Sequence, residues 1–178
     1  DVTSCSSALG GEISNVDLSQ PVNEDTVKAL QDAWKEHLVL LFRGQNLTDK
    51  DLVRVSNYFG TCDKAPPNEA RGYGPGHVPE MPEVTVISNV VKSGGPIGSL
   101  SNDELAWHTD MSYNEKPADG SALYAIELPK KGGGKTSFLN MYMACETLPC
   151  NLKKKIESKF AIHDATLTSA GTIRQGFQ

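Results

Sequence analysis

The chain has 178 residues, of which 38% are apolar, and a formal net charge of −5 at pH 7. This length suits one domain with a substantial core and is short for two. The charge balance offers no basic stripe for nucleic acid, and no apolar run approaches the roughly 18 residues of a membrane span. These features predict a small-molecule partner and neither nucleic acid nor membrane, and they leave a homo-oligomer open.

The four cysteines, Cys5, Cys62, Cys145 and Cys150, show no Cys-x-x-Cys spacing. This pattern argues against a zinc knuckle or a thioredoxin-like redox pair. The sequence also has no recognisable signal peptide. We therefore expect a cytoplasmic protein whose thiols stay reduced.

The first forty residues predict a strand, a helix and a second strand. Residues 12–18 alternate polar and apolar side chains, as in a half-buried strand. Asn23 can cap the helix that follows. One buried stripe of this helix is formed by Val27, Leu30, Trp34 and Leu38. Residues 39–42 are all apolar, which places them centrally in a sheet.

The rest of the chain mixes helices, loops and short strands. Thr48 and Asp51 approximate a capping box, which opens a helix ending at Gly60. Residues 66–82 and 92–102 are rich in Pro and Gly and predict loops able to close over a substrate. Further strands are expected at residues 84–88, 121–128, 136–140 and 160–164. A helix broken near Pro149 is expected over residues 141–158.

The triplet His108-Thr109-Asp110 is the strongest chemical signal in the chain. In an extended segment the side chains at positions i and i+2 share a face, so His108 and Asp110 would converge on one point. One imidazole and one carboxylate are two-thirds of the facial triad that holds Fe(II) in non-heme oxygenases. By itself the triplet favours a surface or cap His near a turn Asp.

The remaining histidines have weaker signals. His37 lies near a helix C-terminus, where an imidazole stabilises the last carbonyls. His77 lies in the first Pro- and Gly-rich loop, and His163 on a predicted strand could reach a metal only if Asp164 faced away. Trp107 is expected to be a wall of the site. The glycines at 132–134 predict a hairpin turn, because Pro129 stands where a phosphate loop needs Gly.

Several blocks of the sequence, in one order along the chain, resemble the taurine dioxygenase family of Fe(II)- and 2-oxoglutarate-dependent oxygenases. These blocks are residues 10–18, 39–45, 59–60, 107–113, 128–136 and 162–164. The resemblance implies a mainly β fold with flanking helices (α+β), built on a double-stranded β-helix or jelly-roll core related to cupins. Residues 1–178 would form one oxygenase domain that covers the N-terminal and central part of this fold, incomplete at the C-terminus.

The resemblance also implies the chemistry. His108 and Asp110 match the family's first two iron ligands, and Thr136 matches the Thr that helps to hold the far carboxylate of 2-oxoglutarate. The implied cofactor is Fe(II), with 2-oxoglutarate and O2 as co-substrates. The implied reaction hydroxylates or otherwise oxidises a small-molecule C–H bond and releases succinate and CO2. Glu104 stands where taurine dioxygenase has a substrate-contacting Asn, which suggests that it binds an amine or hydroxyl.

Two departures from the family pattern qualify this interpretation. Ala65 and Asn68 replace the His and Tyr that grip taurine's sulfonate, so we expect another substrate. The family's second iron His and its 2-oxoglutarate-binding Arg have no match before Gln178, and we expect them in a continuation of the natural polypeptide. The alternative is a non-catalytic jelly-roll binding protein or a fragment. If the chain ending at Gln178 were itself soluble, monomeric and catalytically active, His163 would become the first residue to test as an iron ligand.

Overall fold

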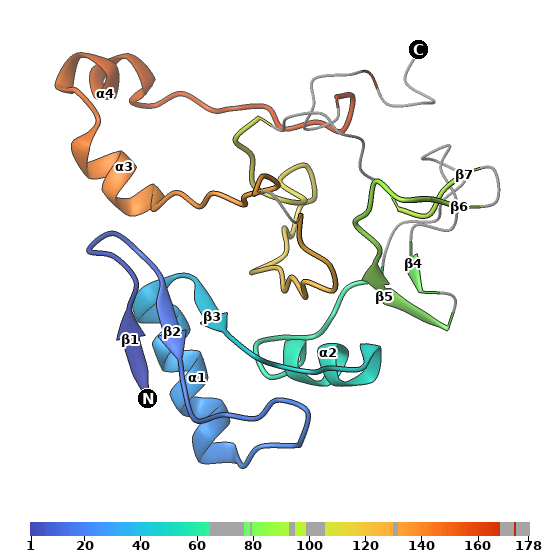
Figure 1. The fold of residues 1–178 in the computed structure, drawn as a ribbon. Coiled ribbons are helices and arrows are strands. Elements are labelled where there is room, and N and C mark those ends of the chain that lie inside the picture. Colours follow the sequence, from blue (N-terminus) through green and yellow to red (C-terminus); the bar gives the residue numbers. More distant parts are fainter. Residues whose placement is uncertain are drawn as a thin grey trace. The chain divides into compact units, whose positions relative to one another are not determined.

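The computed structural model describes residues 1–64, 77–78, 80–92, 95–98, 106–129, 132–167 and 173 (Figure 1). Contacts within the chain divide it into two compact units. The first comprises Asp1–Phe59 and Leu123–Ala161, and the second comprises Gly60–Ala122 and Ile162–Gln178. The prediction that residues 1–178 form a single domain stays a prediction.

The first unit is built on a mixed three-stranded sheet. Its strands are β1 (Val2–Ser4), β2 (Gly11–Ile13) and β3 (Leu40–Phe42), in the order β1-β2-β3. β1 and β2 pair antiparallel, whereas β2 and β3 pair parallel with Ile13 opposite Phe42. In the described part of the chain β3 is therefore an edge strand, and the central position predicted for residues 39–42 is wrong because β2 occupies it. The strand predicted over residues 12–18 is confirmed only at its start.

Helix α1 (Glu24–His37) connects the two parallel strands (Figure 1). The side chain of Asn23 caps it by accepting a hydrogen bond of 2.8 Å from the backbone N–H of Thr26. The helix ends where Leu38 turns left-handed, with a φ of 65°, and donates its N–H to the carbonyl of Trp34. The predicted cap is confirmed, and so is the position of His37 as the last helical residue. Its role in stabilising the last carbonyls stays a prediction.

Helix α2 (Asp49–Ser56) follows β3 and begins with the predicted capping box. The Thr48 side chain accepts from the N–H of Asp51, and the Asp51 carboxylate accepts from the N–H of Thr48. The helix ends at Ser56, earlier than the predicted Gly60, because the N–H groups of Tyr58 and Phe59 form tight turns with carbonyls three residues back.

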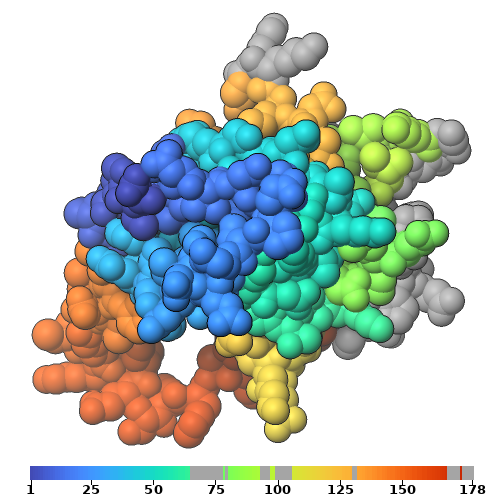
Figure 2. Space-filling model, turned by 90° about the horizontal axis from the view of Figure 1, so that it is seen from below, coloured from blue at the N-terminus to red at the C-terminus, as the bar shows by residue number. Residues whose placement is uncertain are grey.

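The buried core of the first unit lies between the sheet and the two helices. Its members are Ile13, Leu18, Leu30, Ala33 and Val55. The rings of Trp34 and Phe59 meet edge to face beside this core, with centroids 5.5 Å apart. The space-filling view shows residues 1–59, in blue to teal, as one closely packed surface (Figure 2). Of the apolar stripe predicted for α1, Leu30 is a member of this buried core.

Residues 123–161 of the first unit contain two short helices, α3 (Met141–Thr147) and α4 (Cys150–Ile156). The chain turns between them at Leu148 and Pro149, which confirms the predicted break. The strands predicted over residues 121–128 and 136–140 are wrong: both stretches are irregular. A strand needs a neighbouring strand for its backbone hydrogen bonds, and no described residues pair with these, so side chains such as Ile126 remain exposed.

The second unit contains two short antiparallel ribbons. β4 (His77–Val78) pairs with β5 (Met81–Thr85), and β6 (Val91–Lys92) pairs with β7 (Gly95–Pro96). The strand predicted at residues 84–88 is thus shifted toward the N-terminus, and both predicted loops contain strand residues. The strand predicted at 160–164, which runs across both units, is wrong, since Phe160 and Ile162 are almost fully exposed in irregular backbone.

The described elements form a mixed sheet with helices, an α+β arrangement. None of the described helices is both long and apolar enough to cross a membrane. All four cysteines lie among the described residues, and they form no disulfide.

Candidate metal centre

The side chains of His108 and Asp110 meet in the second unit. Nε2 of His108 lies 3.2 Å from Oδ1 of Asp110. The backbone from Ala106 to Thr109 is irregular, without strand pairing, and a turn begins at Asp110. The predicted convergence of the two side chains is therefore confirmed, although an irregular segment produces it where we expected an extended one.

A backbone carbonyl fixes the orientation of the His108 ring. Nδ1 of His108 lies 2.8 Å from the carbonyl oxygen of Ala106. A carbonyl can only accept a hydrogen bond, so Nδ1 carries the proton, and in the neutral ring the lone pair is on Nε2. That lone pair faces the Asp110 carboxylate, which is also an acceptor. Two acceptors this close are stabilised when a proton or a metal cation lies between them.

The carboxylate of Asp110 has a second partner on its other oxygen. The hydroxyl of Ser121 donates to Oδ2 at a distance of 3.1 Å. On the C-terminal side, Met111 has a left-handed φ of 57°, and its carbonyl accepts from the N–H of Asn114 at 2.9 Å. This tight turn carries the chain away immediately after Asp110, so the carboxylate stays 60% exposed.

The separation of the two donor atoms suits a shared metal ion. Donors about 2.1 Å from an octahedral metal and at right angles to each other are about 3.0 Å apart, close to the 3.2 Å between His108 Nε2 and Asp110 Oδ1. One nitrogen and one carboxylate oxygen are also the donor types of the Fe(II) facial triad. Among the described residues, no third His, Cys, Asp or Glu joins the pair.

The other predicted site residues have different outcomes. Thr136 is exposed in an irregular part of the first unit, and its role stays a prediction. His163 is exposed and does not join the pair in the described structure. Trp107 is 67% exposed, and its role as a wall of the site stays a prediction. Glu104, Ala65 and Asn68 lie outside the described residues.

The remaining predictions concern the three glycines at 132–134 and His77. Gly132, Gly133 and Gly134 all have positive φ, between 58° and 108°, which only glycine adopts readily in succession. No strand flanks these glycines among the described residues, so the predicted hairpin is wrong. The segment also does not lead into a helix that could hold phosphate. His77 belongs to the short strand β4.

Sequence reasoning missed the two groups that hydrogen-bond to the pair, the Ala106 carbonyl and the Ser121 hydroxyl. A backbone carbonyl gives no sequence signal. Ser121 lies eleven residues beyond Asp110, and its approach depends on how the intervening turns fold back. No periodicity could have indicated this contact.

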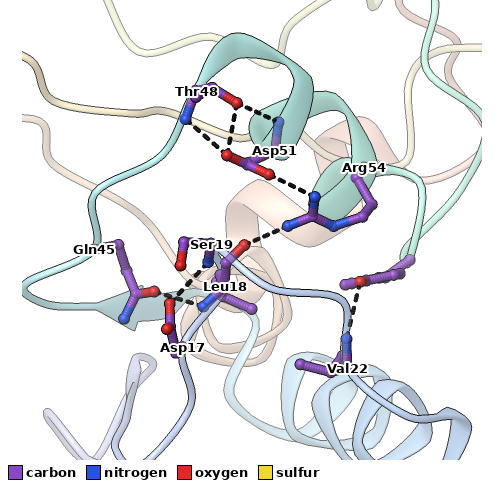
Figure 3. Close-up of polar contacts among 9 residues, drawn as sticks. Asp17, Leu18, Ser19, Val22, Gln45, Thr48, Asp51 and Arg54 are labelled. Carbon is purple, nitrogen blue, oxygen red and sulfur yellow. Dashed lines mark hydrogen bonds and ion pairs between the residues drawn. The ribbon is translucent and has the colours of Figure 1, made fainter.

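A second polar network, in the first unit, has a structural role (Figure 3). Arg54 donates to the Leu18 carbonyl at 2.7 Å and also to the Asp51 carboxylate. Hydrogen bonds from the Thr48 hydroxyl and backbone N–H, and then from Arg54, lower the pKa of Asp51 to about 2. A hydrogen bond with Asp51 raises the pKa of Arg54. The network joins α2 to the segment that follows β2.

Comparisons with known proteins agree with the chemistry of the pair. The family model described as "Taurine catabolism dioxygenase TauD, TfdA family" matches residues 1–174. The pentalenolactone F synthase of Streptomyces avermitilis is 32% identical over 97% of this chain and 55% of its own length. The alpha-ketoglutarate-dependent sulfate ester dioxygenase of Pseudomonas putida is 29% identical over 92% of this chain and 49% of its own.

A solved structure also matches part of the chain. A taurine dioxygenase from Burkholderia xenovorans is 29% identical and covers 52% of this chain and 31% of its own, with a TM-score of 0.40. The chain spans about half the length of the two curated relatives named above. Because the family model matches almost the whole chain, the protein belongs to the TauD, TfdA family of dioxygenases.

Proposed function

We propose that the whole protein is an Fe(II)- and 2-oxoglutarate-dependent dioxygenase. It hydroxylates or otherwise oxidises a C–H bond of a small molecule and releases succinate and CO2. The observation that carries this proposal is the convergence of His108 Nε2 and Asp110 Oδ1, 3.2 Å apart, with Nδ1 held by the Ala106 carbonyl. Membership in the family supports it.

The residues of this chain would bind and orient the reactants. His108 and Asp110 would hold Fe(II) through one nitrogen and one oxygen, a set that leaves positions open for other ligands. Bound Fe(II) with 2-oxoglutarate supplies the oxidising chemistry that protein side chains lack. Thr136 would donate its hydroxyl to the far carboxylate of 2-oxoglutarate and so fix the orientation of the co-substrate.

The substrate is proposed to be a small molecule other than taurine. Relatives of this chain are named for sulfate esters and for 2,4-dichlorophenoxyacetate, both organic anions. Ala65 and Asn68 lack the side chains that would grip taurine, and Glu104 is proposed to bind an amine or hydroxyl of the substrate. Residues 66–82 and 92–102 would cover the bound substrate and exclude water.

We further propose the jelly-roll core and a cytoplasmic location for the whole protein. Family membership supports the first. The four cysteines form no disulfide, which is consistent with a reducing compartment.

Succinate formation tests the proposed activity. The whole protein would be supplied with Fe(II), 2-oxoglutarate and a panel of sulfate esters and aryloxyacetates, and succinate would be measured. We expect turnover that is lost in His108→Ala and in Asp110→Asn but kept in Asp119→Asn, a matched change at an exposed carboxylate of the same unit. Circular dichroism would verify that each variant is folded.

Two results would contradict the proposal. Full turnover by folded His108→Ala would remove the pair from the iron site. Absence of Fe(II) binding and of succinate in the wild-type protein would favour the alternative of a non-catalytic binding protein.

A further inference from the structure

The two carboxylate oxygens of Asp110 have separate partners. Oδ1 faces His108 Nε2 at 3.2 Å, and Oδ2 accepts a hydrogen bond from the Ser121 hydroxyl at 3.1 Å. His108 and Ser121 are the polar partners of this side chain among the described residues. The Asp110 side chain is 60% exposed, so packing does little to restrict its rotation. The hydrogen bond from Ser121 therefore occupies one carboxylate oxygen while the other faces His108.

This orientation matters for a metal held by few protein ligands. A carboxylate can bind a metal through one oxygen or through both, and the second mode fills a coordination position. A site that must also bind a co-substrate and O2 needs that position open. A hydrogen bond from Ser121 to Oδ2 favours binding through Oδ1 alone. Partners of this kind often orient metal ligands, and their loss typically lowers metal affinity about 10- to 100-fold.

We propose that Ser121 is a positioning residue, which keeps Asp110 as a one-oxygen ligand by binding its other oxygen. The inference rests on the proposed function, since it assumes that His108 and Asp110 hold the metal. The Ala106 carbonyl has the corresponding role for His108 through Nδ1. Each of the two ligand side chains is thus hydrogen-bonded through the atom that does not bind the metal, Nδ1 in His108 and Oδ2 in Asp110.

The test compares two variants of similar shape in the whole protein. Ser121→Thr keeps the hydroxyl, whereas Ser121→Val replaces it with a methyl group. Mn(II) affinity would be measured by titration in the absence of turnover, and the affinity of the Mn(II)-loaded protein for 2-oxoglutarate would follow. His108→Ala reports on the metal pair itself, and Ser14→Ala, at an exposed serine of the first unit, is the control.

We expect Ser121→Val to weaken Mn(II) binding about 10- to 100-fold. We also expect Ser121→Val to weaken the binding of 2-oxoglutarate to the Mn(II)-loaded protein. If Asp110 binds the metal through both oxygens, it fills the coordination position that 2-oxoglutarate needs. Ser121→Thr and Ser14→Ala should stay close to wild type. If His108→Ala weakens Mn(II) binding but Ser121→Val does not, the role of Ser121 is wrong and the metal pair stands. If His108→Ala has no effect, both are wrong.

Discussion

The side-chain amide of Gln45 binds the backbone around Leu18. Its Oε1 accepts from the N–H of Leu18 at 2.8 Å (Figure 3). Its Nε2 donates to the carbonyls of Val16 and Arg43 at 3.0 and 3.2 Å. One side chain thereby satisfies three backbone groups in the segments that follow β2 and β3. The hydroxyl of Tyr124 binds the same region, since it donates to the Gln45 carbonyl and accepts from the N–H of Leu47.

Replacing Gln45 should destabilise the first unit. Gln45→Ala removes three hydrogen bonds and leaves the N–H of Leu18 without its partner, which should lower the free energy of unfolding by about 2 kcal/mol. Urea unfolding monitored by circular dichroism measures this change. Gln20→Ala, at an exposed glutamine, should have little effect. Equal stability of the two variants would show that water replaces the Gln45 contacts without cost.

Stability should depend on Asp51 at acid pH. Hydrogen bonds from Thr48, with a smaller contribution from Arg54, place the folded-state pKa of Asp51 at about 2, below its ordinary value of 3.8. Because the pKa of Asp51 is lower in the folded state, its ionised carboxylate stabilises the fold fully at pH values above the pKa of the unfolded state. This stabilisation disappears as the pH falls through the pKa of the folded state. The stability difference between wild type and Asp51→Asn should therefore shrink between about pH 4 and pH 2.

Urea unfolding at a series of pH values measures this dependence. Asp63→Asn, at an exposed carboxylate, serves as the reference. A difference between wild type and Asp51→Asn that stays constant across this range would argue against the lowered pKa.

Leu18 should be among the side chains most sensitive to truncation. It is 2% exposed and belongs to the core cluster. Leu18→Ala should lower the free energy of unfolding by about 2–5 kcal/mol, because it removes buried methyl groups and leaves a cavity. Leu128→Ala, where the side chain is 71% exposed, should cost far less. Similar midpoints for both variants in a thermal unfolding experiment would contradict the placement of the core.

Thr136 provides a test of co-substrate binding. A hydroxyl that donates to a carboxylate contributes roughly 1.5–3 kcal/mol, so Thr136→Val should weaken 2-oxoglutarate binding about 10- to 100-fold. Thr136→Ser keeps the hydroxyl and should bind nearly as well as wild type. Calorimetric titration of the metal-loaded whole protein gives both dissociation constants. Unchanged binding by Thr136→Val, with the metal still bound, would leave Thr136 without a role in the site.

The sequence predicted the local features of this structure well. The Asn23 cap and the Thr48–Asp51 box depend on contacts three residues apart, so the residues that decide them are adjacent in the printed chain. The convergence of His108 and Asp110 is local in the same sense. The strands predicted at residues 121–128 and 136–140 failed because a strand also depends on a partner distant in sequence, and composition does not specify that partner.

The same distinction explains what was missed at the candidate site. Ser121 reaches Asp110 across eleven residues of turns and irregular backbone, whose path no hydrophobic period encodes. The edge position of β3 was missed for a related reason. An all-apolar run predicts burial on two faces, but in the described structure Leu41 is 37% exposed and β3 has one neighbouring strand.

The position of the buried core in the chain has a consequence for biosynthesis. All five buried apolar side chains that the structure describes precede residue 60, and the three strands beside them lie within the first 42 residues. A unit can fold once all of its contacting residues have been synthesised, and a ribosome adds only about 5–20 residues per second. We expect the nascent chain to bury Leu18 and Leu30 before the segment with His108 is synthesised. Protease protection of ribosome-bound chains of increasing length would reveal this order.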